Sequence, residues 1–199
     1  MAKVALTLLA LLFAGYCWWD GRGVACPPGV LAPNEPVQQL VKDGPRWELD
    51  GGIRLQALAR FEVEARVLGA ERYRMDREAA LSPVDLALGW GPMSANENLE
   101  PLSISQGGRF YRYSWSSYSD LRIPSQEIAR HSANMHMVPL DPGVRETLLR
   151  ARRGNLVKLT GWLVEARSPN GFVWKSSLTR NDTGAGACEL VAVESVELR

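Results

Sequence analysis

Both histidines of the 199-residue chain, together with two of its five methionines, lie in the short segment HSANMHM at residues 131–137. Imidazole and thioether groups together suit Cu(I) in an exported protein, and a pair of histidines can begin a zinc or copper site. The candidate metal ligands are His131, Met135, His136 and Met137. The alternative is structural: the first histidine closes a helix, and the methionines fill gaps in the core before Pro139. A copper site requires the two histidines to converge in space.

Two other groups of residues are candidates for hydrolysis. The segment DTGA, from Asp182 to Ala185, resembles the catalytic tripeptide of retroviral-type aspartic proteases, in which two such aspartates share a proton. Those enzymes place an apolar strand before the aspartate, whereas TRN precedes it here, so a polar loop is the favoured interpretation. Lys175 and Ser177 share one face of a strand and form the second candidate, with an exposed polar face as the alternative. The chain contains no G-x-S-x-G, S-x-x-K, H-E-x-x-H, C-x-x-C or P-loop pattern, which favours a non-enzymatic role.

Aromatic side chains offer a candidate binding surface. If several of them share one face of a sheet, they form a platform for a peptide, a glycan or a partner protein. The candidate residues of this platform are Trp90, Tyr111, Tyr113, Trp115, Trp162 and Trp174. Packing in the core explains the same residues equally well.

The first nineteen residues differ from the rest of the chain because residues 4–19 form a run of sixteen residues without a charge. At about 1.5 Å per residue this run covers about 24 Å of a roughly 30 Å hydrocarbon core, which is a marginal length. Trp18 and Trp19 at its outer end are typical of a membrane interface and favour a retained anchor. Small residues ending at Ala25 favour the alternative, a cleaved signal peptide.

The charges around this run predict its orientation. The α-amino group and Lys3 precede it, whereas the charges that follow nearly cancel, so the N-terminus should stay inside. We therefore expect a single-pass protein of the inner membrane, held through residues 4–19, with its domain facing the periplasm. If residues 1–25 are cleaved, the domain is exported.

A proline-rich tether is predicted between the anchor and the domain, at residues 20–45. Four of the twelve prolines fall between residues 27 and 36, which favours a stiff, extended spacer or, equally, a loop lying on the domain surface. Residues 46–199 should form a single exported β-rich domain. A disulfide between Cys26 and Cys188 would connect the tether to the last strand, with two unbridged cysteines as the alternative.

Composition limits the class of function. Hydrophobic residues make up 46% and charged residues 23% of the chain, which is ordinary for a globular protein. The formal net charge is +1, so no basic excess is present to displace cations from phosphates, and nucleic acid is not an expected partner. Apart from copper, no cofactor is indicated.

The clearest structural pattern is the alternation over residues 53–67, where every odd position is apolar and Leu58 is the one apolar residue at an even position. This period of two predicts a long half-buried strand. Helices are predicted over residues 82–91, 124–131 and 141–154, capped by Ser82, Ser125 and Asp141. Strands are predicted over residues 109–115, 155–166, 172–179 and 188–198, with a hairpin turn at Asn170-Gly171.

These elements predict an α+β fold with a mainly antiparallel sheet that curls into a small barrel, preceded by an N-terminal membrane helix. The segment VKLTGWLVEA resembles the first strands of OB-type barrels, in which a glycine such as Gly161 lets the strand bend sharply. The expected architecture is therefore OB-like in its C-terminal part.

The phrases PPGVLAPNEPVQ, SPVDLALGWGPMS, SANMHMVP and SSLTRNDTGAGACEL resemble an uncharacterised family of small membrane-tethered bacterial envelope proteins. The resemblance spans most of the chain and implies the same localisation, without an activity. The favoured hypothesis is a membrane-anchored, non-enzymatic binding or assembly module whose partner is an envelope protein or a glycan. The alternatives are an exported copper-binding protein and a hydrolase that uses Asp182 or the Lys175/Ser177 pair.

Overall fold

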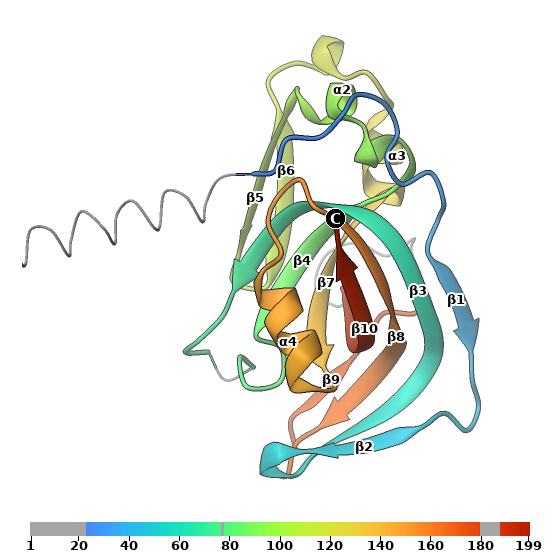
Figure 1. The fold of residues 1–199 in the computed structure, drawn as a ribbon, viewed down its shortest axis with the longest axis vertical. Helices are drawn as coiled ribbons and strands as arrows, with labels where there is room; N and C mark the ends of the chain where they lie inside the picture. Colours follow the sequence, from blue (N-terminus) through green and yellow to red (C-terminus); the bar gives the residue numbers. More distant parts are fainter. Residues whose placement is uncertain (1–22, 77, 180–187) are drawn as a thin grey trace, which may run out of the picture.

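The computed structural model describes residues 23–76, 78–179 and 188–199, and within them the chain is a mixed α+β protein made mostly of strands (Figure 1). The strands are β1 (Val37–Leu40), β2 (Arg46–Leu49), β3 (Ile53–Arg72), β4 (Val84–Gly89), β5 (Leu102–Gly107), β6 (Phe110–Trp115), β7 (Ser132–Pro139), β8 (Leu156–Arg167), β9 (Val173–Lys175) and β10 (Glu189–Leu198). The helices are α2 (Asn96–Leu99), α3 (Ser125–Arg130) and α4 (Pro142–Leu149), with short 3-10 turns η1 (Asp50–Gly52), η2 (Gly91–Ser94) and η3 (Tyr118–Asp120). The predicted α+β class with an antiparallel-rich sheet is confirmed.

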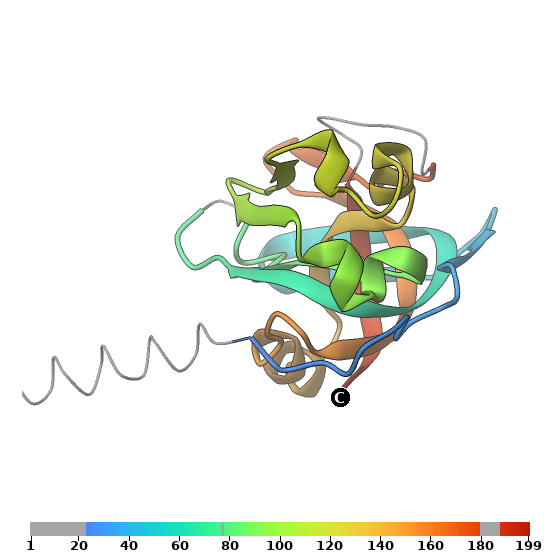
Figure 2. The same ribbon diagram turned by 90° about the horizontal axis from the view of Figure 1, so that it is seen from above.

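Five strands pair with one another in a closed cycle. β3 pairs with β4, β4 with β7, β7 with β10, β10 with β8, and β8 returns to β3. Every pairing in this cycle is antiparallel except that of β7 with β10. Figures 1 and 2 show the long β3 curving around β8 and β10, with β1 and β2 along its outer side. The main hydrophobic core is built from the inward residues of all five strands and from α4.

The predicted strand at residues 53–67 is confirmed as the first three quarters of β3. Phe61 and its alternate neighbours on the same face are fully buried in the main core. Leu58 breaks the alternation in the sequence, and the structure has a register shift between Ala57 and Ala59 at the same place. This bulge turns the strand, so that Leu55 packs in a second cluster on the other face of the sheet.

The predicted helix at residues 82–91 is wrong, because residues 84–89 form strand β4. All six residues of β4 are buried between β3 and β7. A strand that is covered on both faces lacks the alternation of apolar and polar residues that identifies a half-buried strand. Without that alternation, the cap-like residues Ser82 and Pro83 favoured a helix. Ser82 caps no helix, and its hydroxyl lies 3.4 Å from the Asp85 carboxylate.

The predicted helices at residues 124–131 and 141–154 are confirmed as α3 and α4, with corrected ends. Pro124 occupies the N-cap of α3, so Ser125 is the first helical residue and does not cap it. The Asp141 carboxylate caps α4 by accepting hydrogen bonds from the Gly143 and Val144 amides, at 2.8 and 3.0 Å. α4 ends at Leu149, five residues before the glycine that we expected to stop it.

Replacing Asp141 with alanine should lower the free energy of unfolding by about 1 kcal/mol, because two amides at the start of α4 lose their acceptor. Urea unfolding followed by tryptophan fluorescence measures the change. Asp141→Asn keeps an acceptor oxygen and should recover most of the loss. Equal stability of the alanine variant and the wild type would contradict the prediction.

The C-terminal strands follow the predicted order. The Ser168 amide donates to the Phe172 carbonyl at the turn, Gly171 has a positive φ, and β9 pairs with the end of β8, so the predicted hairpin at Asn170-Gly171 is confirmed. Gly161 lies at the centre of β8, opposite Phe61 on β3 and Val193 on β10. A Cβ atom at this position would overlap the Ala192 carbonyl oxygen, so the close approach of β8 and β10 requires glycine.

The proline-rich segment lies along the domain. Ser94 Oγ accepts hydrogen bonds from the Leu31 and Ala32 amides, and Asn96 donates to the Cys26 and Pro27 carbonyls. Residues 23–36 therefore take the surface-loop form and are not a free spacer. The predicted membrane run lies in residues 1–22, outside the described residues, and no helix of the described ranges is long and apolar enough to cross a membrane.

Strands β5 and β6 form a separate two-stranded hairpin. The hairpin packs over a third cluster that includes Leu68, Met93 and Ile128. In Figure 2 it lies to one side of the five-stranded cycle, next to β4 and β7. The chain that enters and leaves it comes from β4 and returns to β7, so the hairpin is an insertion between two neighbouring strands.

Candidate functional site

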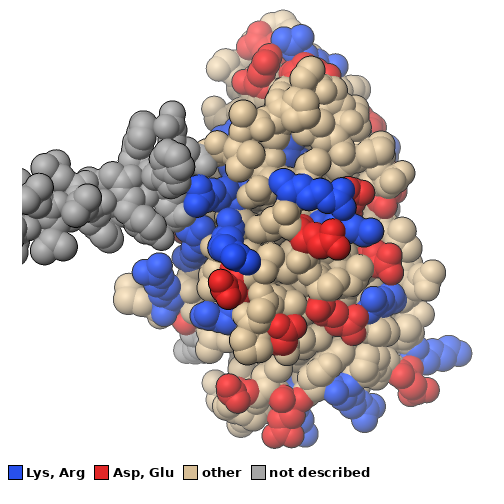
Figure 3. Space-filling view, viewed as in Figure 1, with Lys and Arg blue, Asp and Glu red and all other residues tan. Residues whose placement is uncertain are grey.

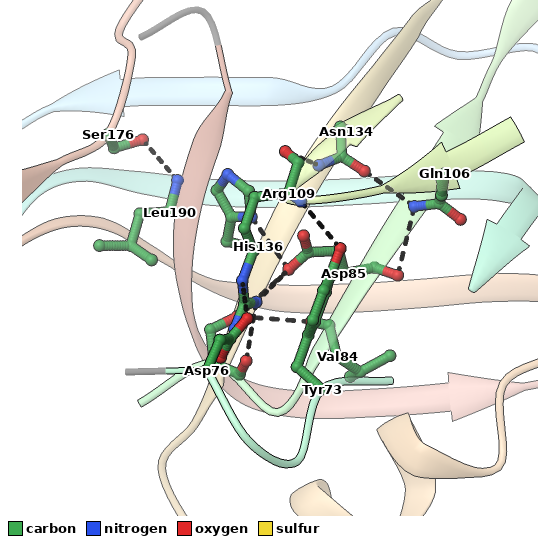
Figure 4. A network of polar contacts seen from close by, with 11 residues as sticks. Tyr73, Asp76, Val84, Asp85, Gln106, Arg109, Asn134, His136, Ser176 and Leu190 are labelled. Carbon is green, nitrogen blue, oxygen red and sulfur yellow. Dashed lines mark hydrogen bonds and ion pairs between the residues drawn. The ribbon is translucent and has the colours of Figure 1, made fainter. Parts of the chain in front are cut away.

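A cluster of charged side chains lies on the outer face of β4 and β7 (Figure 4). Asp85 on β4 stands opposite His136 on β7, while their neighbours Leu86 and Met135 point into the main core. The Asp85 and His136 side chains are 1% and 4% exposed. His136 Nδ1 lies 2.9 Å from Asp85 Oδ1, although the ring is not aligned for a hydrogen bond. A buried carboxylate is stable only with charged or donating partners, so this pair requires others.

The main partner of Asp85 is Arg109, from the tight turn between β5 and β6. Arg109 follows Gly108, and both residues have a positive φ, 69° for the arginine. This conformation is uncommon for a side chain larger than asparagine, and here it directs the guanidinium toward β4. Arg109 Nη1 donates to Asp85 Oδ1 at 2.8 Å and to the Ser82 carbonyl at 2.9 Å.

The same guanidinium binds a second carboxylate in a bidentate manner. Arg109 Nε donates to Asp76 Oδ2 at 3.0 Å, and Nη2 donates to Oδ1 at 2.8 Å. All three guanidinium nitrogens therefore have acceptors within the protein. Asp76 is 31% exposed, so water screens it more than it screens Asp85. We call Asp76, Asp85, Arg109, His136 and the rings around them the Arg109 cluster.

Aromatic rings enclose the cluster. The guanidinium of Arg109 lies 3.6 Å from the centre of the Tyr73 ring, a cation–π contact. Tyr73 Oη accepts a hydrogen bond from the Arg109 amide at 3.0 Å, and burial raises the pKa of Tyr73 to about 12, so the ring stays neutral. Trp174 on β9 covers the other side, with its ring 4.6 Å from the His136 ring.

Two amide side chains connect the cluster to the strand backbones. Asn134 Nδ2 donates to the Arg109 carbonyl at 3.2 Å, and Asn134 Oδ1 accepts from Gln106 Nε2 at 2.8 Å. Gln106 lies on β5 and Asn134 on β7, so these bonds cross from the hairpin to the five-stranded cycle. Together with Arg109 they hold the turn of the hairpin against β4 and β7.

The geometry favours a structural role for the cluster over catalysis. An Asp–His pair can serve as a general base when the imidazole reaches a substrate, but His136 is almost fully buried, and Asp85 Oδ1 is shared with Arg109. Asp85 Oδ2 has no hydrogen-bond partner among the described residues. The Arg109 cluster therefore acts as a charged contact that fixes the β5–β6 hairpin, at the cost of burying a carboxylate.

The four predicted metal ligands do not lie together. Met135 and Met137 are fully buried in the main core, and His136 points to the opposite face of β7. His131 is the C-cap of α3, where its Nδ1 lies 3.0 Å from the Glu127 carbonyl oxygen. These positions agree with the structural alternative, in which His131 closes a helix and the two methionines fill the core. In the described part of the chain no three His, Cys, Asp or Glu side chains group to hold a metal ion.

The residues predicted for hydrolysis do not form a site in the described part of the chain. Asp182 lies in residues 180–187, outside the described ranges. Lys175 is exposed on β9, opposite Glu165, whereas Ser177 is buried beyond the end of that strand. The Ser177 hydroxyl donates to the Thr179 carbonyl at 2.9 Å and accepts from the Thr179 amide. The two side chains therefore have separate surroundings.

Cys26 and Cys188 are not bonded to each other in the structure. The Cys26 thiol donates to the Gly154 carbonyl, beside the chain end at which Leu156 pairs with Arg199. Cys188 immediately precedes β10, at the other end of that strand. Ten residues of strand span about 33 Å, whereas a disulfide requires Cα atoms about 6 Å apart. The predicted disulfide between Cys26 and Cys188 of one chain is therefore wrong.

The six aromatic residues of the predicted platform divide among separate places. Trp90 is 1% exposed and belongs to the main core. Trp162 lies on β8, where its Nε1 donates to Glu194 and its ring stacks near Arg60. Burial alone would raise the pKa of Glu194, but hydrogen bonds from Arg60 and Trp162 outweigh it and lower that pKa. Trp174 belongs to the Arg109 cluster.

The other three aromatic residues form a row along one face of β6. The Tyr111 and Tyr113 rings are 5.5 Å apart, and the Tyr113 and Trp115 rings are stacked at 6.3 Å. Tyr118 extends the row beyond the strand, with an edge-on contact of 5.2 Å to Trp115. Burial raises the pKa of Tyr111 to about 12, whereas Tyr118, at the other end, is 72% exposed. We call these four rings the β6 aromatic row.

An open hollow of about 580 Å³ lies at the exposed end of this row. Its walls come from the start of β5 and the turn after β6, and they are mostly polar. The lining residues are Glu100, Pro101, Leu102, Ser103, Ser116, Asp120 and Arg122. Arg122 Nη2 lies 3.3 Å from Glu100 Oε2, an exposed contact that water screens. The hollow thus combines carboxylates, hydroxyls and a guanidinium, and two of its lining residues, Ser116 and Asp120, lie on either side of Tyr118 in the chain.

Sequence reasoning missed the Arg109 cluster. The available signals were Asp85 inside the apolar run VDLALG and Arg109 directly after two glycines. Each is common by itself, and their contact joins residues 24 positions apart.

Comparisons of this chain with protein-family models, with curated proteins and with solved structures gave no match.

Proposed function

We propose that this chain is a non-enzymatic binding module of the bacterial envelope, anchored in the inner membrane by residues 4–19 with its domain in the periplasm. The uncharged run and the two tryptophans at its outer end support the anchor. The resemblance to small membrane-tethered envelope proteins supports the same location. Asp85 and His136 are buried and Asp85 is bound by Arg109, which supports a structural role for this cluster and not a catalytic one.

We further propose that the five-stranded cycle is an OB-type barrel. Its support is the order of the strands around the cycle, β3-β4-β7-β10-β8. Counted along the chain, the third and fifth strands of the cycle, β7 and β10, pair in parallel, and α4 lies between the third and fourth strands, β7 and β8. OB-type barrels bind oligosaccharides and oligonucleotides on the face of their second and third strands. Those strands are β4 and β7 here, and the β5–β6 hairpin covers them. Fold-level likeness therefore directs attention to the hairpin as the binding element.

The observation that carries the proposal is the β6 aromatic row, which ends at an exposed ring beside a polar hollow. Aromatic rings stack on the apolar faces of sugar rings, and carboxylates and guanidinium groups form hydrogen bonds with sugar hydroxyls. Tyr118 supplies the ring, and Glu100, Asp120 and Arg122 supply the polar groups. The balanced net charge gives no basis for a nucleic-acid ligand. Envelope glycan is therefore the ligand class that this surface fits best.

Replacing Tyr118 with alanine should weaken the binding of the full chain to glycan about threefold to tenfold, because one stacking contact is lost. The measurement is co-sedimentation of the detergent-solubilised full chain with purified, insoluble peptidoglycan over a range of concentrations. Tyr118 is exposed, so the melting temperature should stay the same.

Phe110→Ala is the matched control for this experiment. Phe110 lies at the opposite end of β6 and is 42% exposed. Its replacement therefore removes a ring of similar size that lies outside the aromatic row. It should leave sedimentation unchanged. No sedimentation of the wild type, or an equal loss in both variants, would reject the glycan proposal.

A further inference from the structure

The chain enters the described domain beside the end of α4. The Val24 amide donates to the Arg153 carbonyl at 2.7 Å, and the Cys26 thiol donates to the Gly154 carbonyl at 2.9 Å. Gly154 has a φ of +98°, and a Cβ atom there would overlap the Val24 backbone. These contacts fix the first described residues against the segment that follows α4.

Three arginines lie in that segment. Arg150 is the C-cap of α4, and Arg152 and Arg153 follow it. Arg150 and Arg152 line an open hollow of about 390 Å³ whose wall also includes Val24. Arg150 Nη1 lies 3.7 Å from the carboxylate of Glu146, which is highly exposed and therefore neutralises little of its charge. Figure 3 shows lysine and arginine side chains gathered on the face where the described chain begins.

Arg66, on β3, is a further positive charge that interacts with Arg153. Its guanidinium is buried and donates to the Ser94 carbonyl at 3.1 Å. Burial lowers the pKa of Arg66, Cys26 opposes this shift, and the positive charge of Arg153 adds a smaller lowering.

The length of chain before Gly23 limits how far this surface can lie from the membrane. Only Asp20, Gly21 and Arg22 separate Trp19, the outer end of the proposed anchor, from Gly23. Four residue steps span at most about 14 Å even when fully extended. Electrostatic attraction acts over about 8 Å at physiological salt. Because residues 23–36 lie on the domain, they cannot lengthen this connection.

We infer that the surface formed by Arg150, Arg152 and Arg153 rests on the headgroups of anionic phospholipids in the membrane that holds the anchor. The inference depends on the proposed anchor, which brings the surface to the membrane. Guanidinium groups bind phosphate oxygens in a planar, bidentate manner. The domain is then held close to the bilayer with one orientation, and the β5–β6 hairpin has a fixed direction relative to the membrane.

The test uses the full chain reconstituted in lipid nanodiscs, made either of phosphatidylcholine alone or with one third phosphatidylglycerol. Hydrogen exchange of peptides covering residues 145–155 is measured by mass spectrometry in both. We expect exchange at least about fivefold slower with the anionic lipid, since each arginine near an anionic surface contributes a factor of that size. Raising the salt to 0.5 M should remove the difference.

Substitution tests the residues themselves. The triple variant Arg150→Ala, Arg152→Ala and Arg153→Ala should lose the lipid dependence, and the triple lysine variant should keep part of it. The matched control changes three exposed arginines at the other end of β3 and β8 to alanine. These are Arg46, Arg54 and Arg167. The control should behave as the wild type, and a melting curve in phosphatidylcholine nanodiscs shows that each variant is folded.

The outcomes separate this inference from the proposed function. A chain that enters nanodiscs but exchanges equally in both lipids contradicts the docking surface alone. A chain that does not enter nanodiscs contradicts the anchor, and with it the surface. Equal loss of protection in the control triple variant assigns the effect to general charge and also contradicts the inference.

Discussion

Replacing Arg109 with alanine should destabilise the protein by about 3–5 kcal/mol, because it leaves Asp85 as a buried carboxylate without its charged donor. The Asp85 side chain is 1% exposed, so water cannot replace the lost partner. The substitution also removes the contact with Tyr73 and the bidentate bonds to Asp76. Urea unfolding of the full chain in detergent micelles, followed by tryptophan fluorescence, measures the change.

Two companion variants distinguish a buried charge from a general loss of packing. Asp76→Ala should cost about 1 kcal/mol or less, since Asp76 is partly exposed and leaves no buried charge behind. Asp85→Asn in the Arg109→Ala background should recover a large part of the loss, because the uncompensated charge is removed. A loss below about 1 kcal/mol for Arg109→Ala would show that the cluster does not hold the hairpin.

Replacing Gly161 with alanine should destabilise the protein by about 3 kcal/mol, the upper part of the range for overpacking a core. The added methyl group would overlap the Ala192 carbonyl oxygen. The overlapping atom belongs to the backbone of β10, so a change of rotamer cannot relieve it. β8 would have to move away from β10, and β8 also pairs with β3 along most of its length. A lower melting temperature and a lower urea midpoint are expected.

Gly107→Ala is the matched control for the glycine variant. Gly107 also lies in a strand, its φ is not positive, and no heavy atom lies within 4 Å of the position of an added Cβ. We expect a neutral or slightly stabilising effect, because alanine reduces the freedom of the unfolded chain. If both variants lose the same stability, the close approach of β8 and β10 is not the cause.

Several elements were predictable because their signals are local. The alternation of residues 53–67 identified β3, and even its exception, Leu58, coincides with the bulge. Asp141 and Pro142 marked the start of α4, and Asn170-Gly171 marked the turn between β8 and β9. In each case the residues that produce the structure lie within a few positions of one another, so the pattern is readable without knowledge of the partners.

The errors have a common cause. Residues 84–89 were assigned to a helix because Ser82 and Pro83 resemble a helix start, whereas burial between β3 and β7 decides that they form a strand. The disulfide prediction followed from the compartment and the number of cysteines, with two cysteines that are not adjacent as its alternative; β10 separates Cys26 from Cys188, and the alternative holds. The copper prediction required His131 and His136 to converge, but His131 is the C-cap of α3, before β7 begins, whereas His136 lies within β7 and has different partners.

The amino-acid sequence by itself determined the strands with clear alternation, the capped helix, the hairpin turn and the uncharged N-terminal run. These follow from backbone preferences and side-chain periodicity over short distances. Only the tertiary structure decided the parallel pairing of β7 with β10, the burial of Asp85 against Arg109 and the position of the arginines beside Val24. Each of these joins segments far apart in the chain, and their free energy depends on burial and charge pairing that exist only after the strands have packed together.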